Sequence, residues 1–261
     1  MTEMGREDLD VDQRRQKILE LLEKEAKVKV ADLSMMFSIS NVTIRNDLAE
    51  LEEAGLLERI HGGAVRSHKA YYSMSLKERM KTNEDEKRRI AVKVASMISE
   101  GDTLMMDSGT TTLFIARELK SIKNLTIVTN SLAIAEEIGF RDNIHLILVG
   151  GSLDQRYQFT YGDDAVQQLK KYKADLMVVS ADGASVEDGL TTHHHNEAEV
   201  SRQMMVRANK TVAAVDYTKV GRGSFMFLSD IDCLDVLVTD GKADQEELAL
   251  VRDKGVKVVL V

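Results

Sequence analysis

The sequence predicts an α/β protein: a small N-terminal winged helix-turn-helix domain, followed by a doubly wound, mostly parallel α/β domain. Two observations support this. Near the N-terminus, apolar residues recur at helical spacing in three segments, and two short extended runs follow around a Gly-Gly pair. Further on, continuous apolar runs alternate with helical patterns, as in a parallel sheet covered on both faces. We expect domains at residues 1–66 and 86–261, joined by a linker at 67–85.

The bulk composition narrows the class of protein. Of the 261 residues, 43% are hydrophobic and 30% charged, as in globular rather than disordered or fibrous proteins. Apolar runs stay short of the roughly 20 residues that a membrane helix needs, and the acidic, polar N-terminus is unlike a signal peptide. The single cysteine excludes an internal disulfide framework and fits a reducing compartment. We therefore expect a cytoplasmic protein with no membrane partner.

The charge balance is acidic. The net charge is −8 at pH 7, and the first 70 residues also carry more acidic than basic side chains. This excludes a protein coated in positive charge for nucleic acid, so any DNA contact depends on where individual basic residues lie. The acidic residues Glu50, Glu52 and Glu53 should form a solvated helix face whose end tilts away from phosphates.

Two helices are expected first, at residues 11–27 and 30–37. Both segments carry apolar residues at helical spacing, and charges separate those of the longer one. The side chains that the second segment should bury are Ala31, Leu33, Met36 and Phe37.

A third helix is expected at residues 41–54, with Ser40 as its N-cap. Ile44, Leu48 and Leu51 follow one another at spacings of four and three, so they should form one buried stripe. The two extended runs on either side of Gly62-Gly63 then predict a hairpin, or wing. Three helices followed by a hairpin is the order of a winged helix-turn-helix, whose third helix enters the DNA major groove. An ordinary small helical domain is the alternative.

Seven strands alternate with helices in the second domain. The predicted strands are 103–107, 125–130, 144–151, 174–183, 211–216, 235–241 and 256–261. The predicted helices are 86–99, 111–119, 165–172, 196–209 and 244–253. A domain of this size should bury roughly 70% of its unfolded surface, enough to enclose a pocket.

Polar residues collect at the carboxyl ends of the strands, where open α/β sheets bind ligands. The first strand runs into Asp107-Ser108-Gly109-Thr110-Thr111 and then a helix, whose N–H groups suit a phosphate. Serine and threonine at a helix start are also ordinary caps, so this segment alone leaves both interpretations open. Later strand ends add Thr129, Asn130, Ser131, Gly150, Gly151, Asp182, Gly183 and Lys219. Together these hydroxyl, amide, carboxylate and lysine groups predict a cleft for a sugar phosphate.

Three further features have a structural and a functional interpretation. His193, His194 and His195 could bind zinc, but consecutive residues rarely converge on one ion, so we expect loop residues near the cleft. We expect no cofactor and no metal. Cys233 should be a buried packing residue, and the methionine pairs at 35–36, 105–106 and 204–205 should fill the core.

The third helix and the wing resemble the helix-turn-helix signature of the DeoR family. Ser40-Asn41-Val42-Thr43-Ile44-Arg45-Asn46-Asp47-Leu48 is similar to the family's Ser-x-x-Thr-Ile-Arg-Arg-Asp-Leu, and residues 59–64 to its Arg-x-His-Gly-Gly-Ala. Asn46 replaces the second arginine, which removes a phosphate or base contact and could weaken or redirect binding. The resemblance implies DNA contacts through Ser40, Asn41, Thr43, Arg45, Asn46, Arg59 and His61.

The rest of the chain resembles the sensor domain of the same family. The strand-end segments above and Glu197 fall where that domain has its motifs. The family's sensor domain is similar to the ribose-5-phosphate isomerase fold and responds to phosphorylated sugars, so the resemblance implies an effector site at these residues. The isomerases carry Asp-Gly-Ala-Asp where this chain has Asp182-Gly183-Ala184-Ser185. The missing carboxylate removes a candidate general acid or base, which favours a sensor over an enzyme.

The resemblance therefore implies a DNA-binding transcriptional regulator, a repressor of a sugar-metabolism operon whose operator affinity a phosphorylated sugar controls. Because a single winged helix buries too little surface for tight specific binding, we expect a homodimer or homotetramer on double-stranded operator DNA. The alternative is a sugar-phosphate isomerase with an attached nucleic-acid module, for which Asp107, Asp182 and Lys219 would supply titratable groups.

Overall fold

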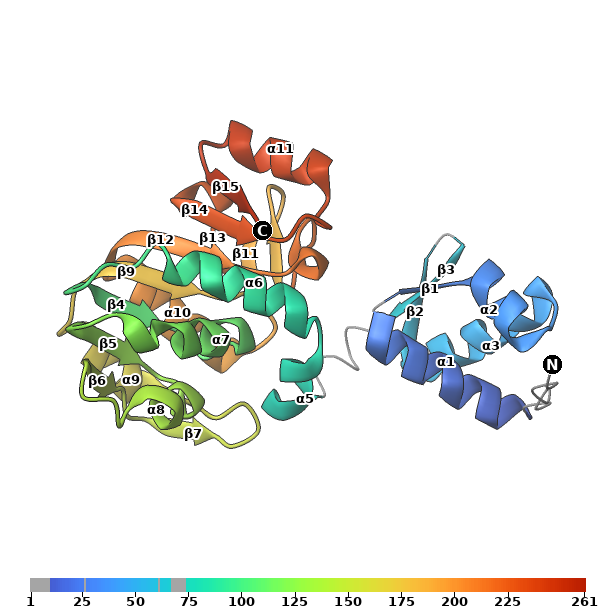
Figure 1. Cartoon of the computed structure of the whole chain (residues 1–261), viewed down its shortest axis with the longest axis horizontal. Helices are drawn as coiled ribbons and strands as arrows, with labels where there is room; N and C mark the ends of the chain where they lie inside the picture. Colours follow the sequence, from blue (N-terminus) through green and yellow to red (C-terminus); the bar gives the residue numbers. More distant parts are fainter. Residues whose placement is uncertain (1–9, 26, 61, 67–73) are drawn as a thin grey trace. The chain divides into compact units, whose positions relative to one another are not determined.

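The computed structural model of the chain describes residues 10–25, 27–60, 62–66 and 74–261. The chain divides into two compact units, Met1–Thr82 and Asn83–Val261 (Figure 1). Each unit has a buried hydrophobic cluster of its own. The proposed domain limits at residues 66 and 86 stay a prediction.

The first unit contains the three predicted helices, α1 (Val11–Glu25), α2 (Val30–Phe37) and α3 (Asn41–Glu53). The predicted cap of α3 is confirmed, because Oγ of Ser40 accepts a hydrogen bond from the backbone N of Thr43 over 3.1 Å. The predicted stripe is confirmed as well, and its buried residues are Ile44, Leu48 and Leu51.

The predicted wing is also confirmed, as strands β2 (Leu57–Ile60) and β3 (Gly63–Arg66). A third strand, β1 (Lys27–Lys29), was not predicted. It pairs antiparallel with β3, so that the sheet order is β1-β3-β2. A Cβ atom at Gly63 would collide with the carbonyl oxygen of Val28, which explains why glycine stands where β1 approaches β3.

The predicted burial on α2 is wrong for Ala31 and Met36. The buried residues of this helix are Val30 and Leu33, while Met35 is 77% and Met36 58% exposed. Phe37 is half-buried. The helix has only eight residues, and its core-facing stripe follows positions 30, 33 and 37, which leaves the methionine pair outside it.

The segment expected as a linker includes a short helix, α5 (Leu76–Lys81). A capping box begins it: Oγ of Ser75 accepts from the backbone N of Glu78, and the Glu78 carboxylate accepts from the backbone N of Ser75. The next helix, α6 (Glu84–Ala95), starts three residues after α5 ends.

The second unit is built on a seven-stranded sheet in which every pairing is parallel, as predicted. The strand order is β15-β14-β12-β9-β4-β5-β6. The strands are β4 (Thr103–Met106), β5 (Leu125–Thr129), β6 (Ile144–Leu148), β9 (Ala174–Val179), β12 (Ala208–Ala214), β14 (Val236–Thr239) and β15 (Lys257–Leu260). Because all run the same way, their carboxyl ends meet along one edge.

Helices cover both faces of this sheet. In Figure 1, α6 and α7 lie in front of the strands and α10 behind them, and both α6 and α10 contact β12. The remaining helices are α7 (Thr110–Glu118), α8 (Leu132–Ile138), α9 (Asp163–Leu169), α10 (His195–Val206) and α11 (Gln245–Asp253). No helix in the described part of the chain is both long and apolar enough to cross a membrane.

Two of the expected strands end early because the chain turns into further small sheets. β6 stops at Leu148 and is followed by the hairpin β7 (Ser152–Asp154) and β8 (Phe159–Tyr161). β9 stops at Val179, after which a second, antiparallel sheet begins. Its strands, in the order β10-β11-β13, are β10 (Gly183–Ser185), β11 (Gly189–Thr192) and β13 (Met226–Ser229).

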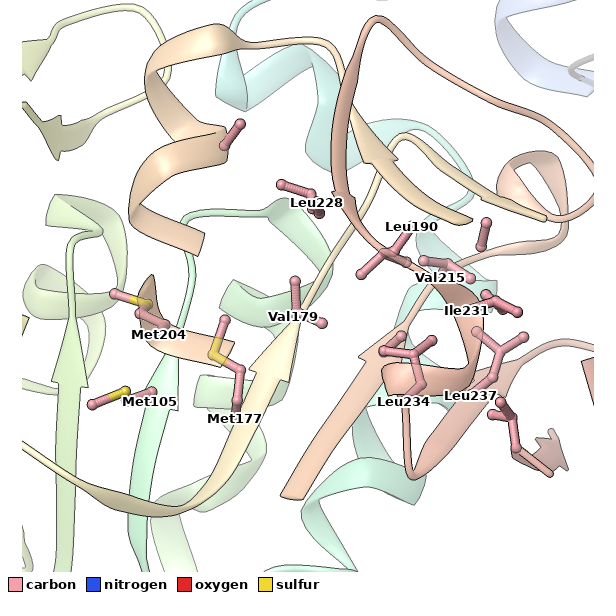
Figure 2. Close-up of a cluster of buried hydrophobic side chains, with 14 of the residues drawn as sticks. Met105, Met177, Val179, Leu190, Met204, Val215, Leu228, Ile231, Leu234 and Leu237 are labelled. Atoms are coloured by element: carbon pink, nitrogen blue, oxygen red, sulfur yellow. The ribbon is translucent and has the colours of Figure 1, made fainter. Parts of the chain in front are cut away.

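The core of the second unit joins the large sheet to the antiparallel one. Figure 2 shows Met105 and Met177 of the large sheet with Met204 of α10, and Leu190 and Leu228 of the antiparallel sheet in the same cluster. The predicted core positions at Met105, Met106 and Met204 are therefore confirmed.

The prediction for Cys233 is wrong, because this residue is exposed. It lies in a 3₁₀ turn, Ile231–Cys233, between two residues that are 3% exposed, Ile231 and Leu234. These two neighbours enter the core (Figure 2), so the cysteine between them is left outside it.

Candidate functional site

The exposed side of α3 carries most of the predicted DNA contacts. Asn41, Arg45 and Asn46 are exposed near the start of the helix. The hydroxyls of Ser40 and Thr43 lie 2.9 Å apart and share the cap, so these two residues also have a structural role.

Asp47, next to these residues, is a functional candidate that the sequence reasoning did not single out. Its carboxylate is buried and accepts hydrogen bonds from Nε of Arg14 over 2.7 Å and Nε of Arg15 over 3.2 Å. Both arginines belong to α1, so Asp47 holds α3 against α1. The signal for this role is a carboxylate in the middle of α3, six residues from either end, on a helix face that is otherwise apolar.

Arg59 of the wing is paired with Glu52 at the end of α3. Glu52 accepts from Nε of Arg59 over 2.6 Å and from its backbone N over 2.8 Å. The backbone N–H and guanidinium of Arg59 lower the pKa of Glu52. The pair connects the helix to the hairpin, and a DNA contact by Arg59 stays a prediction. His61, the other predicted wing contact, lies outside the described residues.

Asp107 lies at the carboxyl end of β4 and is 1% exposed. It accepts backbone hydrogen bonds from Ser180 over 2.8 Å and from Gly109 over 3.3 Å. Burial, together with the negative charge of Glu197, raises the pKa of Asp107 to about 7. This carboxyl group can therefore change its proton occupancy near neutral pH.

Hydrogen bonds through hydroxyl groups connect Ser108, which follows Asp107 in the chain, to the predicted residues Glu197 and Asp182. Ser108 Oγ donates to one oxygen of Glu197 over 2.9 Å, and Thr192 Oγ1 donates to the other over 3.0 Å. Thr192 Oγ1 also lies 3.3 Å from Oδ2 of Asp182, which accepts the backbone N–H of His193 over 2.9 Å. Three carboxylates from separate elements thus lie together beside the ends of β4 and β9.

The predicted phosphate loop is the tightly packed start of α7. A Cβ atom at Gly109 would collide with the Ser180 side chain, and Thr110 and Thr111 are buried. The Thr112 hydroxyl donates back to the carbonyl oxygens of Asp107 and Gly109. Gly183 fits in the same way, because a Cβ atom there would meet Thr191 and the carbonyl oxygen of Arg222.

The strand ends on the other side of β4 form a second polar group, around Thr160 of β8. Asn130 Nδ2 donates to the carbonyl oxygen of Thr160 over 3.0 Å, while its Oδ1 is buried without a hydrogen-bond partner among the described residues. Ser131 caps α8 by accepting from the backbone N of Ile134. Thr129 Oγ1 accepts a hydrogen bond from the backbone N of Ser131. The backbone N of Gly150 donates to Oε1 of Gln168. Gly151 adopts a φ of 146°, and its backbone lies close to the carbonyl oxygen of Tyr161.

A third group surrounds Lys219, which is 7% exposed. Burial alone would raise the pKa of Asp216, but the charges of Lys219 and Lys87 lower it. Asp216 also accepts from Nδ2 of Asn83 over 3.1 Å and from the backbone N of Thr218 over 3.0 Å. Asn83 and Lys87 were not predicted. The signal for Lys87 is a charged residue on the apolar side of α6, where it is 1% exposed.

The three histidines take different positions. The backbone N of His193 binds Asp182, the ring of His194 lies 4.1 Å from that of Tyr157, and His195 begins α10. The hollow along the outside of α6 lies elsewhere in this unit and includes Arg88, Val92 and Val261. The predicted effector-binding residues lie at the carboxyl edge of the sheet instead, and most of them are buried.

Comparison with known families matches both units. Residues 14–70 match the DeoR-like helix-turn-helix domain, and residues 82–241 match the DeoR C terminal sensor domain.

Two relatives match over almost their whole length. The HTH-type transcriptional regulator GolR of Listeria innocua is 34% identical over 246 residues, which cover 94% of this chain and 97% of that protein. The glycerol-3-phosphate regulon repressor of Escherichia coli is 30% identical over 248 residues, covering 95% and 98%. Among solved structures, a ribose 5-phosphate isomerase of Methanocaldococcus jannaschii aligns with 52% of this chain and 54% of its own, at 18% identity and a TM-score of 0.39.

Proposed function

The chain belongs to the DeoR family of transcriptional regulators, and from that premise we propose that it represses a sugar-metabolism operon through an operator affinity that a phosphorylated sugar controls. The first unit reads the operator, and the carboxyl edge of the large sheet binds the effector. The curated relatives are transcriptional regulators and repressors, and one is named for the glycerol-3-phosphate regulon.

The observation that carries the effector half is the pair of buried lysines beside the carboxyl edge. Lys87 and Lys219 are 1% and 7% exposed, and both act on the single carboxylate of Asp216. Buried ammonium groups beside the carboxyl edge of the sheet suit the negative charge of a phosphate. The carboxylates of Asp107, Asp182 and Glu197 accept hydrogen bonds, which suits the hydroxyl groups of a sugar.

The observation that supports the DNA half is the exposed start of α3. Asn41, Arg45 and Asn46 are exposed there, while the opposite stripe is buried in the domain. Asparagine can pair with adenine and arginine with guanine in the major groove. A homodimer or homotetramer would place two such helices on a repeated or palindromic operator.

A direct experiment measures binding of the full-length protein to labelled DNA from upstream of its own reading frame, by fluorescence anisotropy, with and without a panel of sugar phosphates. We expect Arg45→Ala to weaken operator binding by several-fold or more without changing the effector response. Ser108→Ala should keep operator binding and blunt the effector response, because Ser108 connects to Glu197. Normal behaviour of both variants would place the two sites elsewhere.

A further inference from the structure

An apolar side chain is exposed at the start of the recognition helix. Val42, in the first turn of α3, is 62% exposed, whereas Ile44, two residues on, is completely buried. Helical geometry places Val42 on the same side as Arg45 and Asn46, three and four residues later. This side is opposite the buried stripe, and it carries the residues that are proposed to read DNA.

The stability of α3 alone does not explain a valine at position 42. A β-branched side chain loses rotamer freedom in a helix, and its apolar surface gains nothing while it faces water. Single exposed apolar residues are common on protein surfaces, so exposure alone says little. The position of Val42 between Asn41 and the Arg45–Asn46 pair is what gives it a specific use.

We infer that Val42 contacts the 5-methyl group of a thymine in the operator, and so selects thymine over cytosine at one base pair of each half-site. The inference rests on the proposed role of α3 as the DNA-reading helix. The thymine methyl is an apolar group on the major-groove edge. Valine has no donor or acceptor beyond its backbone, so at a cytosine it would leave the N4 amino group without a partner.

The charge on this side of α3 suits duplex DNA better than an apolar protein partner. The exposed Arg45 supplies a positive charge beside Val42, and the amino-terminal end of α3 carries the positive end of its helix dipole. An apolar protein surface would leave these charged and polar neighbours unpaired, whereas phosphates and base edges satisfy them.

The test begins with selection of preferred duplexes from a random-sequence library by the full-length protein. Each dT of the selected site is then replaced in turn by dU, which removes only the methyl group. Affinities are measured by anisotropy at one fixed salt concentration, because phosphate contacts make all affinities depend on salt. The proteins compared are the wild type, Val42→Ala, Val42→Thr and, as a control, Met35→Ala on α2, whose side chain is also exposed.

At one dT of each half-site, dU should weaken wild-type binding about fourfold, the factor that corresponds to one buried methyl-sized group. Val42→Ala should bind the dT and dU duplexes equally, Val42→Thr should keep part of the preference, and Met35→Ala should keep all of it. The inference is overturned if the wild type is indifferent to every dU, or if Val42→Ala keeps the full preference. If the selection yields no preferred sequence, sequence-specific reading by this protein fails, and with it the proposed function.

Discussion

Asn83 Nδ2 donates a hydrogen bond to Oδ1 of Asp216 over 3.1 Å. Asn83 is the first residue of the second compact unit and precedes α6, whereas Asp216 lies at the carboxyl end of β12. The same carboxylate is acted on by the charges of Lys219 and Lys87. Asn83, where the chain enters the second unit, is therefore hydrogen-bonded to the carboxylate that interacts with both proposed phosphate-binding lysines.

This contact predicts that Asn83→Ala separates effector binding from the DNA response. An effector that draws Lys219 toward its phosphate would alter the surroundings of Asp216, and Asn83 would pass this change to the start of α6. Effector affinity, measured by calorimetry, should stay near that of the wild type. The effector-induced change in operator affinity should fall well below the 5- to 150-fold range typical of coupled sites.

Asn124→Ala is the matched control. Asn124 also adopts a left-handed φ, of 57° against 49° for Asn83, and its Nδ2 donates to the exposed Glu100. Loss of an asparagine of this conformation away from the carboxyl edge should leave the response intact. If both variants respond alike, Asn83 has no special role in coupling.

Replacement of Lys219 should weaken effector binding while operator binding persists. Lys219→Met keeps the length of the buried side chain but removes its charge, so we expect the affinity for a sugar phosphate to fall about tenfold or more. Lys242→Ala is the control, because Lys242 is exposed and pairs with Glu86. Thermal-shift titration of each variant with the effector measures the difference. Equal affinities would remove Lys219 from the phosphate site.

Asp107 should make the stability of the protein depend on pH. Its pKa is raised to about 7 in the folded chain, so the folded state holds a proton that the unfolded chain, with a pKa near 4, has released. The contribution of this proton to the stability of the folded state is complete below about pH 4 and is lost as the pH rises through about 7. The melting temperature of the wild type should therefore fall more between pH 5 and pH 8 than that of Asp107→Asn.

Glu197→Gln is the control for this pH dependence. The Glu197 charge contributes to the raised pKa of Asp107, second to burial. Its removal should shift the melting-temperature profile toward lower pH without flattening it. A profile identical in all three proteins would show that Asp107 does not titrate in this range.

Asp47 should hold the recognition helix in place. Asp47→Asn breaks buried ion pairs with Arg14 and Arg15, a change that typically costs about 3 kcal/mol. Hydrogen exchange should become faster in α1 and α3 and stay unchanged in the second unit, and operator affinity should fall. Lys17→Ala, which removes an exposed pair with Glu20, should change little. Unchanged exchange in Asp47→Asn would contradict this role.

Local sequence patterns were sufficient to predict the helices with a clear apolar spacing and the strands with a continuous apolar run. The cap at Ser40, the stripe beginning at Ile44 and the seven parallel strands were all predicted from spacing and composition. Strands of only three residues, such as β1 and β10, are too short to show a period of their own, and pairing with distant strands defines them. Burial on the two-turn helix α2 was mistaken for the same reason, since Met36 lies one step from the true stripe.

The candidate site was predicted in outline but not in its connections. The position of Asp107, Asp182 and Lys219 after strand ends made them candidates. The partners that give them their properties come from far along the chain: Asp216 lies 133 residues from Asn83, and Glu197 lies 89 from Ser108. A sequence read locally shows which groups are present, whereas the fold decides which of them share a proton, a charge or a hydrogen bond.

The most direct test of the central claim is the affinity of the full-length protein for its own upstream DNA, measured by anisotropy across a panel of phosphorylated sugars and their unphosphorylated forms. At least one phosphorylated sugar should change that affinity by 5- to 150-fold, the range of ordinary allosteric coupling. The unphosphorylated form should have no effect. An affinity that no phosphorylated sugar changes, or one that the free sugar changes equally, would contradict the account.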